Sequence, residues 1–157
     1  MAGFLSRTAC ILAISALSGA VHAERPLLET LAGQAVGGDA LPKGGLVVFW
    51  HPDCSYCLQE LKALQASPDH ELLAHTATVA LLPHDSVHQG HYVLPAATLN
   101  LASRGNPADV LERYGNREGA LPYAIITRPD GSLCQQLYGS QELAGLHTAL
   151  ASCRAKP

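Results

Sequence analysis

The feature that most limits the possible folds of this chain is an apolar run followed closely by two cysteines. Residues 46–50 read Leu-Val-Val-Phe-Trp, between a glycine pair and a proline-containing turn. Five consecutive apolar residues in that setting are typical of a strand buried on both faces. Cys54 and Cys57 come next and begin an amphipathic helix that continues to Gln65, with leucines at positions 58, 61 and 64. The sequence therefore predicts that a buried strand delivers two cysteines to the N-terminus of a helix.

Strand and helix patterns also alternate along the rest of the chain. In chain order, the further expected elements are a short helix at 27–31, a strand at 76–82, a partly helical stretch at 96–103, a helix at 106–114 begun by Asn106-Pro107, a strand at 123–127, a turn at 129–131, a strand at 133–138 and a helix at 141–153. From residue 46 onward the order begins with a βαβ unit and ends with a hairpin and a helix. This order predicts one α/β domain with a central mixed sheet flanked by helices.

The first 23 residues have the features of a secretory signal peptide. Arg7 supplies a positive charge, residues 9–20 form an apolar run broken only by Ser and Gly, and residues 21–23 have the pattern of a cleavage site. The apolar run is too short to span about 30 Å of hydrocarbon, although an uncleaved anchor is the alternative. We therefore expect a signal peptide at 1–23, a periplasmic location and a mature domain at 24–157.

Composition narrows the classes of partner. The chain has 157 residues, 48% of them apolar, and a net charge of −3 with no run of Lys or Arg. These values fit a single domain with a core and argue against a nucleic-acid partner. Removal of the signal peptide would remove Cys10 and leave an even number of cysteines, at positions 54, 57, 134 and 153. An even number in an exported protein indicates disulfide chemistry.

The placement of Cys54 and Cys57 at the start of a helix predicts thiol chemistry. The free N–H groups and partial positive charge of a helix N-terminus stabilise a thiolate, so we expect the pKa of Cys54 to fall below about 8.5. Cys57, one turn later, is placed to attack a mixed disulfide formed at Cys54. One alternative is half of a zinc site, although the sequence has no second Cys-x-x-Cys pair to complete it. The other alternative is a purely structural disulfide.

The segment Phe49-Trp50-His51-Pro52-Asp53-Cys54-Ser55-Tyr56-Cys57 resembles the active-site segment of the thioredoxin superfamily. Gly119-Ala120-Leu121-Pro122, followed by a strand, resembles the cis-proline loop of that superfamily, and Pro129-Asp130-Gly131 resembles the hairpin turn of its exported TlpA/ResA-like branch. The resemblance covers most of residues 45–153.

Several expectations follow from this resemblance. It implies a thioredoxin fold and a cis Leu121–Pro122 bond, with Pro122 packed against the catalytic Cys54 and Cys57. It also implies that substrate binds along the Leu121 backbone, near Trp50 and Tyr56. The implied activity is that of a protein-disulfide oxidoreductase, with reduction as the favoured direction. Such an enzyme needs no cofactor, acts on protein thiols and disulfides, receives electrons from a membrane thiol donor and works as a monomer.

Three positions depart from the thioredoxin pattern. Val48 stands where thioredoxins bury an acidic residue, so the proton of Cys57 must move through water or another group. Asp53 precedes the first cysteine, and its charge opposes thiolate formation there. The dipeptide Ser55-Tyr56 is similar to those of DsbC, DsbG and glutaredoxins, which leaves an oxidase or isomerase as an alternative to a reductase.

Histidines raise a second class of function. His84, His88 and His91 lie in one loop-like segment, and with His51 and the Cys pair they would suit a copper-binding or copper-delivery module. The simpler interpretation is that they are solvated side chains and that the protein holds no metal. A third hypothesis is a redox-inert exported domain that binds a partner peptide along Leu121–Pro122.

Cys134 and Cys153 are predicted to form a structural disulfide. From Cys134 the last strand runs about five residues, or roughly 17 Å, before the chain turns. The terminal helix returns roughly 18 Å over some twelve residues, which brings Cys153 beside Cys134. Two buried free thiols are the alternative.

Overall fold

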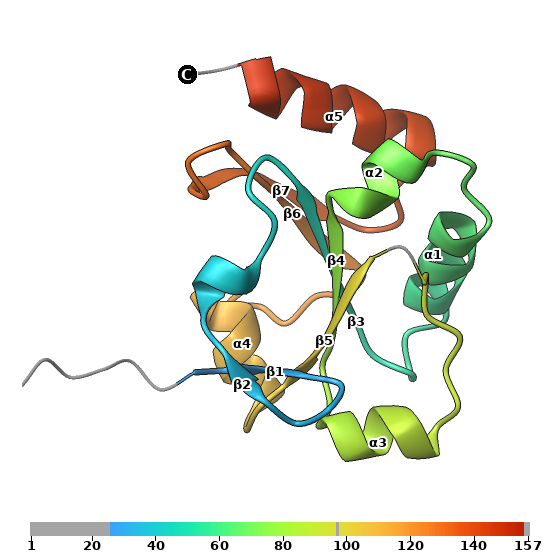
Figure 1. Cartoon of the computed structure of the whole chain (residues 1–157), viewed down its shortest axis with the longest axis vertical. Helices are drawn as coiled ribbons and strands as arrows, with labels where there is room; N and C mark the ends of the chain where they lie inside the picture. Colours follow the sequence, from blue (N-terminus) through green and yellow to red (C-terminus); the bar gives the residue numbers. More distant parts are fainter. Residues whose placement is uncertain (1–25, 97, 156–157) are drawn as a thin grey trace, which may run out of the picture.

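A mixed sheet of seven strands forms the centre of the structure, a computed structural model that describes residues 26–96 and 98–155. The strand order is β2-β1-β5-β4-β3-β6-β7 (Figure 1). Strand β3 lies parallel to β4 and antiparallel to β6, and β4 is parallel to β5. The predicted α/β architecture with a mixed sheet is therefore confirmed. The expected signal peptide lies outside the described residues.

The elements alternate along the chain, as the sequence pattern indicated. Their bounds are β1 Leu28–Thr30, β2 Ala35–Val36, the 3-10 helix η1 Gly38–Ala40, β3 Leu46–Trp50, α1 Ser55–Gln65, α2 His70–Ala74, β4 Thr76–Ala80, α3 His84–Gln89, β5 Leu99–Ser103, α4 Pro107–Arg113, β6 Tyr123–Thr127, β7 Leu133–Tyr138 and α5 Leu143–Ala155. Among these described elements, no helix is both long enough and apolar enough to cross a membrane.

Strand β3 is buried on both faces because helices cover the sheet on each side (Figure 1). Val47 and Phe49 point to the face that α4 covers with Val110 and Leu111. Leu46 and Val48 point to the opposite face, where α1, α2 and α5 supply a set of buried side chains: Leu64, Leu72, Leu73, Leu146, Leu150 and Cys153. Two-sided burial explains why the strand is a continuous apolar run rather than an alternating one.

Local signals placed several elements correctly. Asn106 caps α4, its side-chain oxygen accepting a hydrogen bond from the Ala108 N–H at 3.1 Å, and Pro107 occupies the first helical position. The turn between β6 and β7 is closed by the Gly131 N–H, which donates to the Arg128 carbonyl at 2.8 Å. Gly131 has a φ of +89°, a conformation that suits glycine.

Two predicted helical stretches are strands. Residues 28–30 form β1, which pairs with β5 and, through a tight turn, with β2. Residues 99–103 form β5, which lies between β4 and β1. The spacing of the leucines at 27, 28 and 31 is compatible with a helix or a strand. The strand forms because the sheet supplies hydrogen-bond partners for the backbone, which an isolated turn of helix lacks. The short helices α2 and α3 were not predicted.

Candidate active site

Cys54 and Cys57 lie at the first turn of α1, directly beyond the end of β3 (Figure 1). Their sulfur atoms form a disulfide, with the two Cα atoms 5.2 Å apart. Cys54 is the N-cap of α1, and its sulfur also accepts a hydrogen bond from the Cys57 N–H at 3.2 Å. Cys57 is fully buried, whereas Cys54 is half-buried. One cysteine of the pair is therefore partly accessible and the other is shielded.

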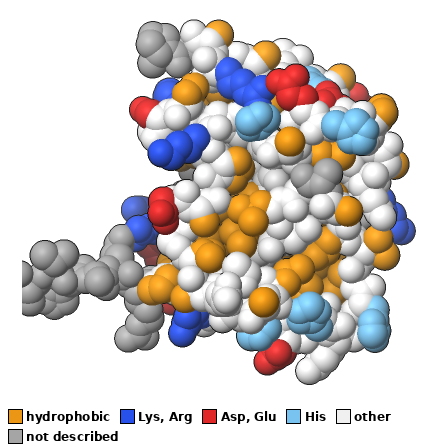
Figure 2. All heavy atoms as spheres, in the orientation of Figure 1, with side chains coloured by type: hydrophobic (Ala, Val, Ile, Leu, Met, Phe, Trp, Pro, Cys, Tyr) orange, Lys and Arg blue, Asp and Glu red, His pale blue; other side chains and the backbone are white. Residues whose placement is uncertain are grey.

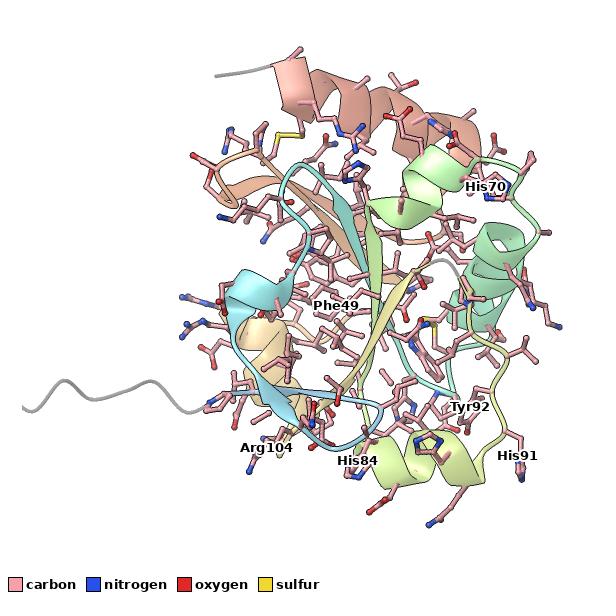
Figure 3. All side chains as sticks on the ribbon, viewed as in Figure 1. Phe49, His70, His84, His91, Tyr92 and Arg104 are labelled. Atoms are coloured by element: carbon pink, nitrogen blue, oxygen red, sulfur yellow. A yellow bond between two sulfur atoms is a disulfide. The ribbon has the colours of Figure 1, made fainter. Side chains whose placement is uncertain are left out.

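Apolar side chains pack around Cys57 and beside Cys54. Trp50 and Cys57 belong to one buried cluster that includes Leu61, Ala80 and Val87. Six partly buried residues pack against this cluster, among them Cys54, Tyr92, Leu94 and Leu121. The Tyr92 ring meets the Trp50 ring edge-on, with 5.1 Å between centroids, and lies beside the C-terminal end of α3 (Figure 3).

The Leu121–Pro122 loop lies beside the same cluster. The Leu121–Pro122 peptide bond is cis, as the resemblance implied. Pro122 is buried, and its carbonyl accepts a hydrogen bond from the Gly139 N–H at 2.9 Å. Because Leu121 and Cys54 pack against one cluster, the structure brings together two segments that are more than sixty residues apart in the chain.

The other two residues expected to contact substrate differ in exposure. Tyr56 is 60% exposed and stands on the first turn of α1, between the two cysteines. Trp50 is fully buried, and its indole N–H has no hydrogen-bond partner among the described residues. Tyr56 is therefore accessible from solvent, whereas the buried Trp50 is not.

The Asp53 side chain extends into solvent. Its side chain is 92% exposed, and the nearest ring nitrogen, His51 Nδ1, lies 3.6 Å from its carboxylate. The Asp53 N–H donates to the same ring nitrogen at 3.2 Å. Water screens a carboxylate this exposed, so its effect on Cys54 is much weaker than its place in the sequence suggests.

Glu60 is a buried acid that the sequence reasoning missed. It lies one turn after Cys57 on α1 and is only 5% exposed. Burial raises the pKa of its carboxyl to about 7, against a smaller opposing effect of the Gln141 backbone. Neither carboxylate oxygen meets hydrogen-bond geometry with any described residue. The available signal was its spacing, since position 60 falls on the same helix face as Cys57 and Leu64.

His84 and His88 lie on α3 and His91 lies just after it; Figure 2 shows histidine side chains on the surface there and a second group over α2. His84 and His88 contact Glu29 and the Leu31 carbonyl, whereas His91 is exposed in the loop that follows α3. Within residues 26–96 and 98–155, no group of three or more His, Cys, Asp or Glu side chains is arranged to hold a metal ion. The geometry gives no support to the copper hypothesis.

Cys134 and Cys153 form a second disulfide, on the α5 side of the sheet. Their Cα atoms are 5.9 Å apart, within the usual range for a bridge. Cys153 is 2% exposed and belongs to the buried cluster that α5 shares with the sheet, and Cys134 packs against the same cluster. The bond fastens the last turn of α5 to β7.

Comparisons with known proteins identify the fold. No protein-family profile and no curated protein sequence matches the chain. Among solved structures, a thioredoxin-related protein from Neisseria meningitidis serogroup B matches with a TM-score of 0.66 and 19% identity, over 82% of this chain and 99% of that one. The exposed lipoprotein thioredoxin of Streptococcus pneumoniae matches at 0.60 and 20% identity, over 80% and 97%.

A third match is a secreted disulfide oxidoreductase of Mycobacterium tuberculosis, with a TM-score of 0.59 and 19% identity over 80% of this chain and 94% of that one. Similarity at this level of identity concerns the path of the chain, and it shows that this protein has a thioredoxin fold.

Proposed function

We propose that this protein is a thiol–disulfide oxidoreductase that exchanges the Cys54–Cys57 dithiol and disulfide with protein substrates. The observation that carries the proposal is a disulfide across the first turn of α1 in which one cysteine is half-buried and the other is fully buried. A purely structural disulfide does not need an accessible sulfur atom, whereas thiol–disulfide exchange with a substrate does.

The reaction proceeds in two exchanges when the protein acts as a reductase. The Cys54 thiolate attacks one sulfur of a substrate disulfide, forms a mixed disulfide and releases the first substrate thiolate, which takes up a proton. Cys57 then loses its proton and attacks Cys54 Sγ, which breaks the mixed disulfide and releases the second substrate thiolate. The substrate gains two electrons, and the protein is left with the Cys54–Cys57 disulfide.

Glu60 supplies the acid–base group that Val48 does not. The Cys57 thiol is buried and must lose its proton before it attacks, and Glu60 is a carboxyl one turn away on the same helix. A pKa of about 7 leaves a substantial fraction of this carboxyl ionised at neutral pH, as a general base requires. Glu60 therefore accepts the Cys57 proton, either directly or through one water.

The substrate lies along the Leu121–Pro122 segment. Leu121 and Cys54 adjoin one apolar cluster, so an extended segment that places its disulfide at Cys54 runs past Leu121. Tyr56, exposed beside the sulfur pair, adds an apolar contact on the other side. These contacts favour an unfolded or extended polypeptide over a small dithiol.

We further propose that the protein is exported by a cleaved signal peptide at 1–23 and works in the periplasm as a monomeric reductase. The pattern of the first 23 residues supports export, and two of the matching structures are described as an exposed lipoprotein and a secreted oxidoreductase. A reductase in an oxidising compartment must be recharged by a dithiol, and a membrane thiol donor fits that role.

The reduction potential of the Cys54–Cys57 couple tests the direction. We expect a value near that of thioredoxin, about −270 mV, rather than the value of about −120 mV of the oxidant DsbA. The potential is measured by equilibration with glutathione or dithiothreitol buffers, together with reduction of a protein disulfide such as that of insulin. A potential near −120 mV would make the protein an oxidase, and a failure to exchange with any protein disulfide would overturn the proposed activity.

A further inference from the structure

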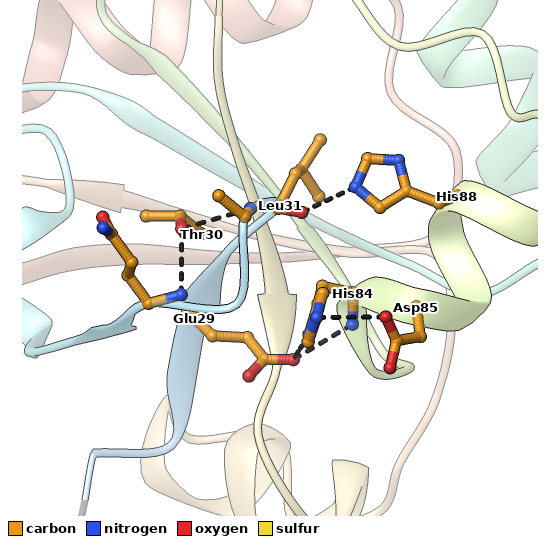
Figure 4. Close-up of polar contacts among 8 residues, drawn as sticks. Glu29, Thr30, Leu31, His84, Asp85 and His88 are labelled. Carbon is orange, nitrogen blue, oxygen red and sulfur yellow. Dashed lines mark hydrogen bonds and ion pairs between the residues drawn. The ribbon is translucent and has the colours of Figure 1, made fainter.

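Helix α3 is fastened to β1 and to the turn that follows it by three hydrogen bonds (Figure 4). Glu29 Oε1 accepts hydrogen bonds from the His84 backbone N–H at 3.0 Å and from the His84 ring Nδ1 at 2.7 Å. The His88 ring donates through Nε2 to the Leu31 carbonyl at 2.6 Å. Gly33 lies so close to the His84 ring that an added Cβ would be 2.8 Å from two ring atoms.

The His84 ring lies between two carboxylates. Nδ1 faces Glu29 Oε1, and Nε2 lies 3.2 Å from Asp85 Oδ1. A carboxylate oxygen accepts hydrogen bonds, so Nδ1 donates to Glu29, and a second carboxylate near Nε2 favours the imidazolium, which carries a proton on both ring nitrogens. The arrangement therefore favours the charged form of the His84 ring.

The charges around His84 favour this state. Glu29 is a carboxylate with 6% exposure, and it would be poorly tolerated without a cationic partner. Burial alone would raise the pKa of Glu29, but the hydrogen bonds from His84, the charge of His84 and that of Arg104 hold it below its ordinary value. The hydrogen bond to Glu29 raises the pKa of His84, and the charge of Asp85 acts in the same direction.

Helix α3 connects this contact to the active site. Val87, one turn after His84, is buried in the cluster that contains Trp50 and Cys57. The chain then turns at Gly90, and Tyr92 packs edge-on against Trp50. A shift of α3 therefore moves Val87 and Tyr92, which pack in the cluster that Cys54 contacts.

We propose that Glu29, His84 and Asp85 form a pH-dependent latch that holds α3 against β1 and the turn that follows it, and thereby positions Val87 and Tyr92 against Trp50 beside the Cys pair. His84 is a positioning residue in this arrangement, because it acts through α3 and does not touch the sulfur atoms. The latch goes beyond the proposed exchange reaction and would exist whether the protein reduces or oxidises its substrates.

The latch holds over a defined range of pH. The folded pKa of His84 is raised, so its contribution is complete below the unfolded value of 6.5 and is lost as the pH rises through the folded pKa. The folded pKa of Glu29 is lowered, so its contribution is complete above the unfolded value of 4.5 and is lost as the pH falls through the folded pKa. The latch is therefore complete between pH 4.5 and pH 6.5, and it releases as the pH rises above that range.

Amide hydrogen exchange of the oxidised protein, measured without substrate between pH 5 and 9, tests the latch. The Val87 and Gly90 N–H groups, which donate to the carbonyls of Pro83 and Ser86, report on α3. We expect their protection to fall about tenfold, after correction for intrinsic exchange, as His84 loses its proton. The chain has a single tryptophan, so the fluorescence of Trp50 should change over the same pH range.

The variant His84→Gln should show low α3 protection at every pH and no step in the fluorescence. His147→Gln is the matched control, because His147 also contacts a carboxylate, Asp69, at 2.8 Å but lies on α5. If His84→Gln does not fold, the NMR titration of His84 in the unmodified protein decides. A His84 pKa at or below 6.5, or a step that survives His84→Gln, overturns the latch. A loosened α3 with unchanged Trp50 fluorescence overturns the link to the active site.

Discussion

Cys54 and Cys57 are three residues apart and are joined at the start of a helix, whereas Cys134 and Cys153 are nineteen residues apart and are joined across a strand and a helix end. The first bond includes a half-buried cysteine, Cys54, which packs against the apolar cluster that contains Trp50. The second lies against the core that α5 shares with the sheet. Location and access, rather than the bond itself, separate a reactive disulfide from a structural one.

The two disulfides also differ in the length of the loop that each one closes. In the chain-entropy account, a disulfide stabilises more when it closes a longer loop, because it restricts the unfolded chain more. The three-residue loop restricts the unfolded chain little, so the Cys54–Cys57 bond can open at small cost to the fold. The nineteen-residue loop holds α5 in place. The predictions below test this division of roles.

The largest effect is expected from the variant Cys54→Ser. Loss of the attacking sulfur should reduce disulfide exchange with a protein substrate by a factor on the order of 10³ or more, since no other reachable thiol replaces it. Cys57→Ser should instead accumulate mixed disulfides at Cys54, visible by non-reducing electrophoresis and mass spectrometry. Mixed disulfides trapped on Cys57 in the Cys54→Ser variant would reverse the assigned roles.

Replacing both Cys134 and Cys153 by alanine should lower the free energy of unfolding by about 3 kcal/mol, as expected for a loop of this length. Denaturant unfolding of the oxidised protein measures the loss, and the exchange rate of the folded variant should be unchanged. Peptide mapping should also show this bond surviving mild dithiol treatment that opens Cys54–Cys57. A variant that is as stable as the parent but slow in exchange would contradict the division between the two bonds.

Glu60→Gln should slow exchange about tenfold near neutral pH and remove the step near pH 7 from the pH–rate profile. The same variant should be more stable than the parent by roughly 2 kcal/mol at pH 8, because ionising a buried carboxyl of raised pKa opposes folding. The free energy of unfolding of the parent should fall as the pH rises from 4.5 to about 7, because the Glu60 carboxyl ionises in the unfolded chain before it does in the folded protein. At pH 4, where the carboxyl is protonated in both states, the two proteins should be equally stable. A slower variant without the stability gain would indicate local damage rather than a lost base.

The smallest effect is expected from Asp53→Asn. Removing a carboxylate next to Cys54 favours the thiolate, but a side chain 92% exposed acts through water, so the rate of alkylation of Cys54 should rise by no more than about threefold. Stopped-flow alkylation at low and high salt measures the change, which should shrink with salt. A tenfold change that persists in salt would show that Asp53 acts at closer range than its exposure allows.

Sequence reasoning succeeded where the signal was local. The Leu46–Trp50 run, the Asn106-Pro107 helix start and the Pro129–Gly131 turn each carry their own structural preference, and all three elements lie where the sequence predicted. It failed at β1 and β5, whose conformation depends on pairing with each other across more than sixty residues of chain. Neither segment has a pattern that excludes a helix.

The same limit applies to the candidate site. The Cys pair and Pro122 belong to recognisable motifs, so their positions could be anticipated from the sequence. The raised pKa of Glu60 comes from packing that encloses the side chain, and the partner of His84 is fifty-five residues away in the chain. Burial and contacts of this kind are properties of the folded molecule, and a residue type alone does not reveal them.

The order of the strands has a consequence for how the molecules behave in concentrated solution. Strand β7 is an edge of the sheet, and within the described residues it pairs only with β6. It is six residues long, contains no proline or charged side chain, and has Leu133 and Tyr138 exposed at its two ends. Long uncharged edges invite pairing between molecules, and charged residues or proline are the usual protection against it. Self-association should therefore begin along β7, and a lysine placed at Gln135 should keep the protein monomeric at concentrations where the parent precipitates.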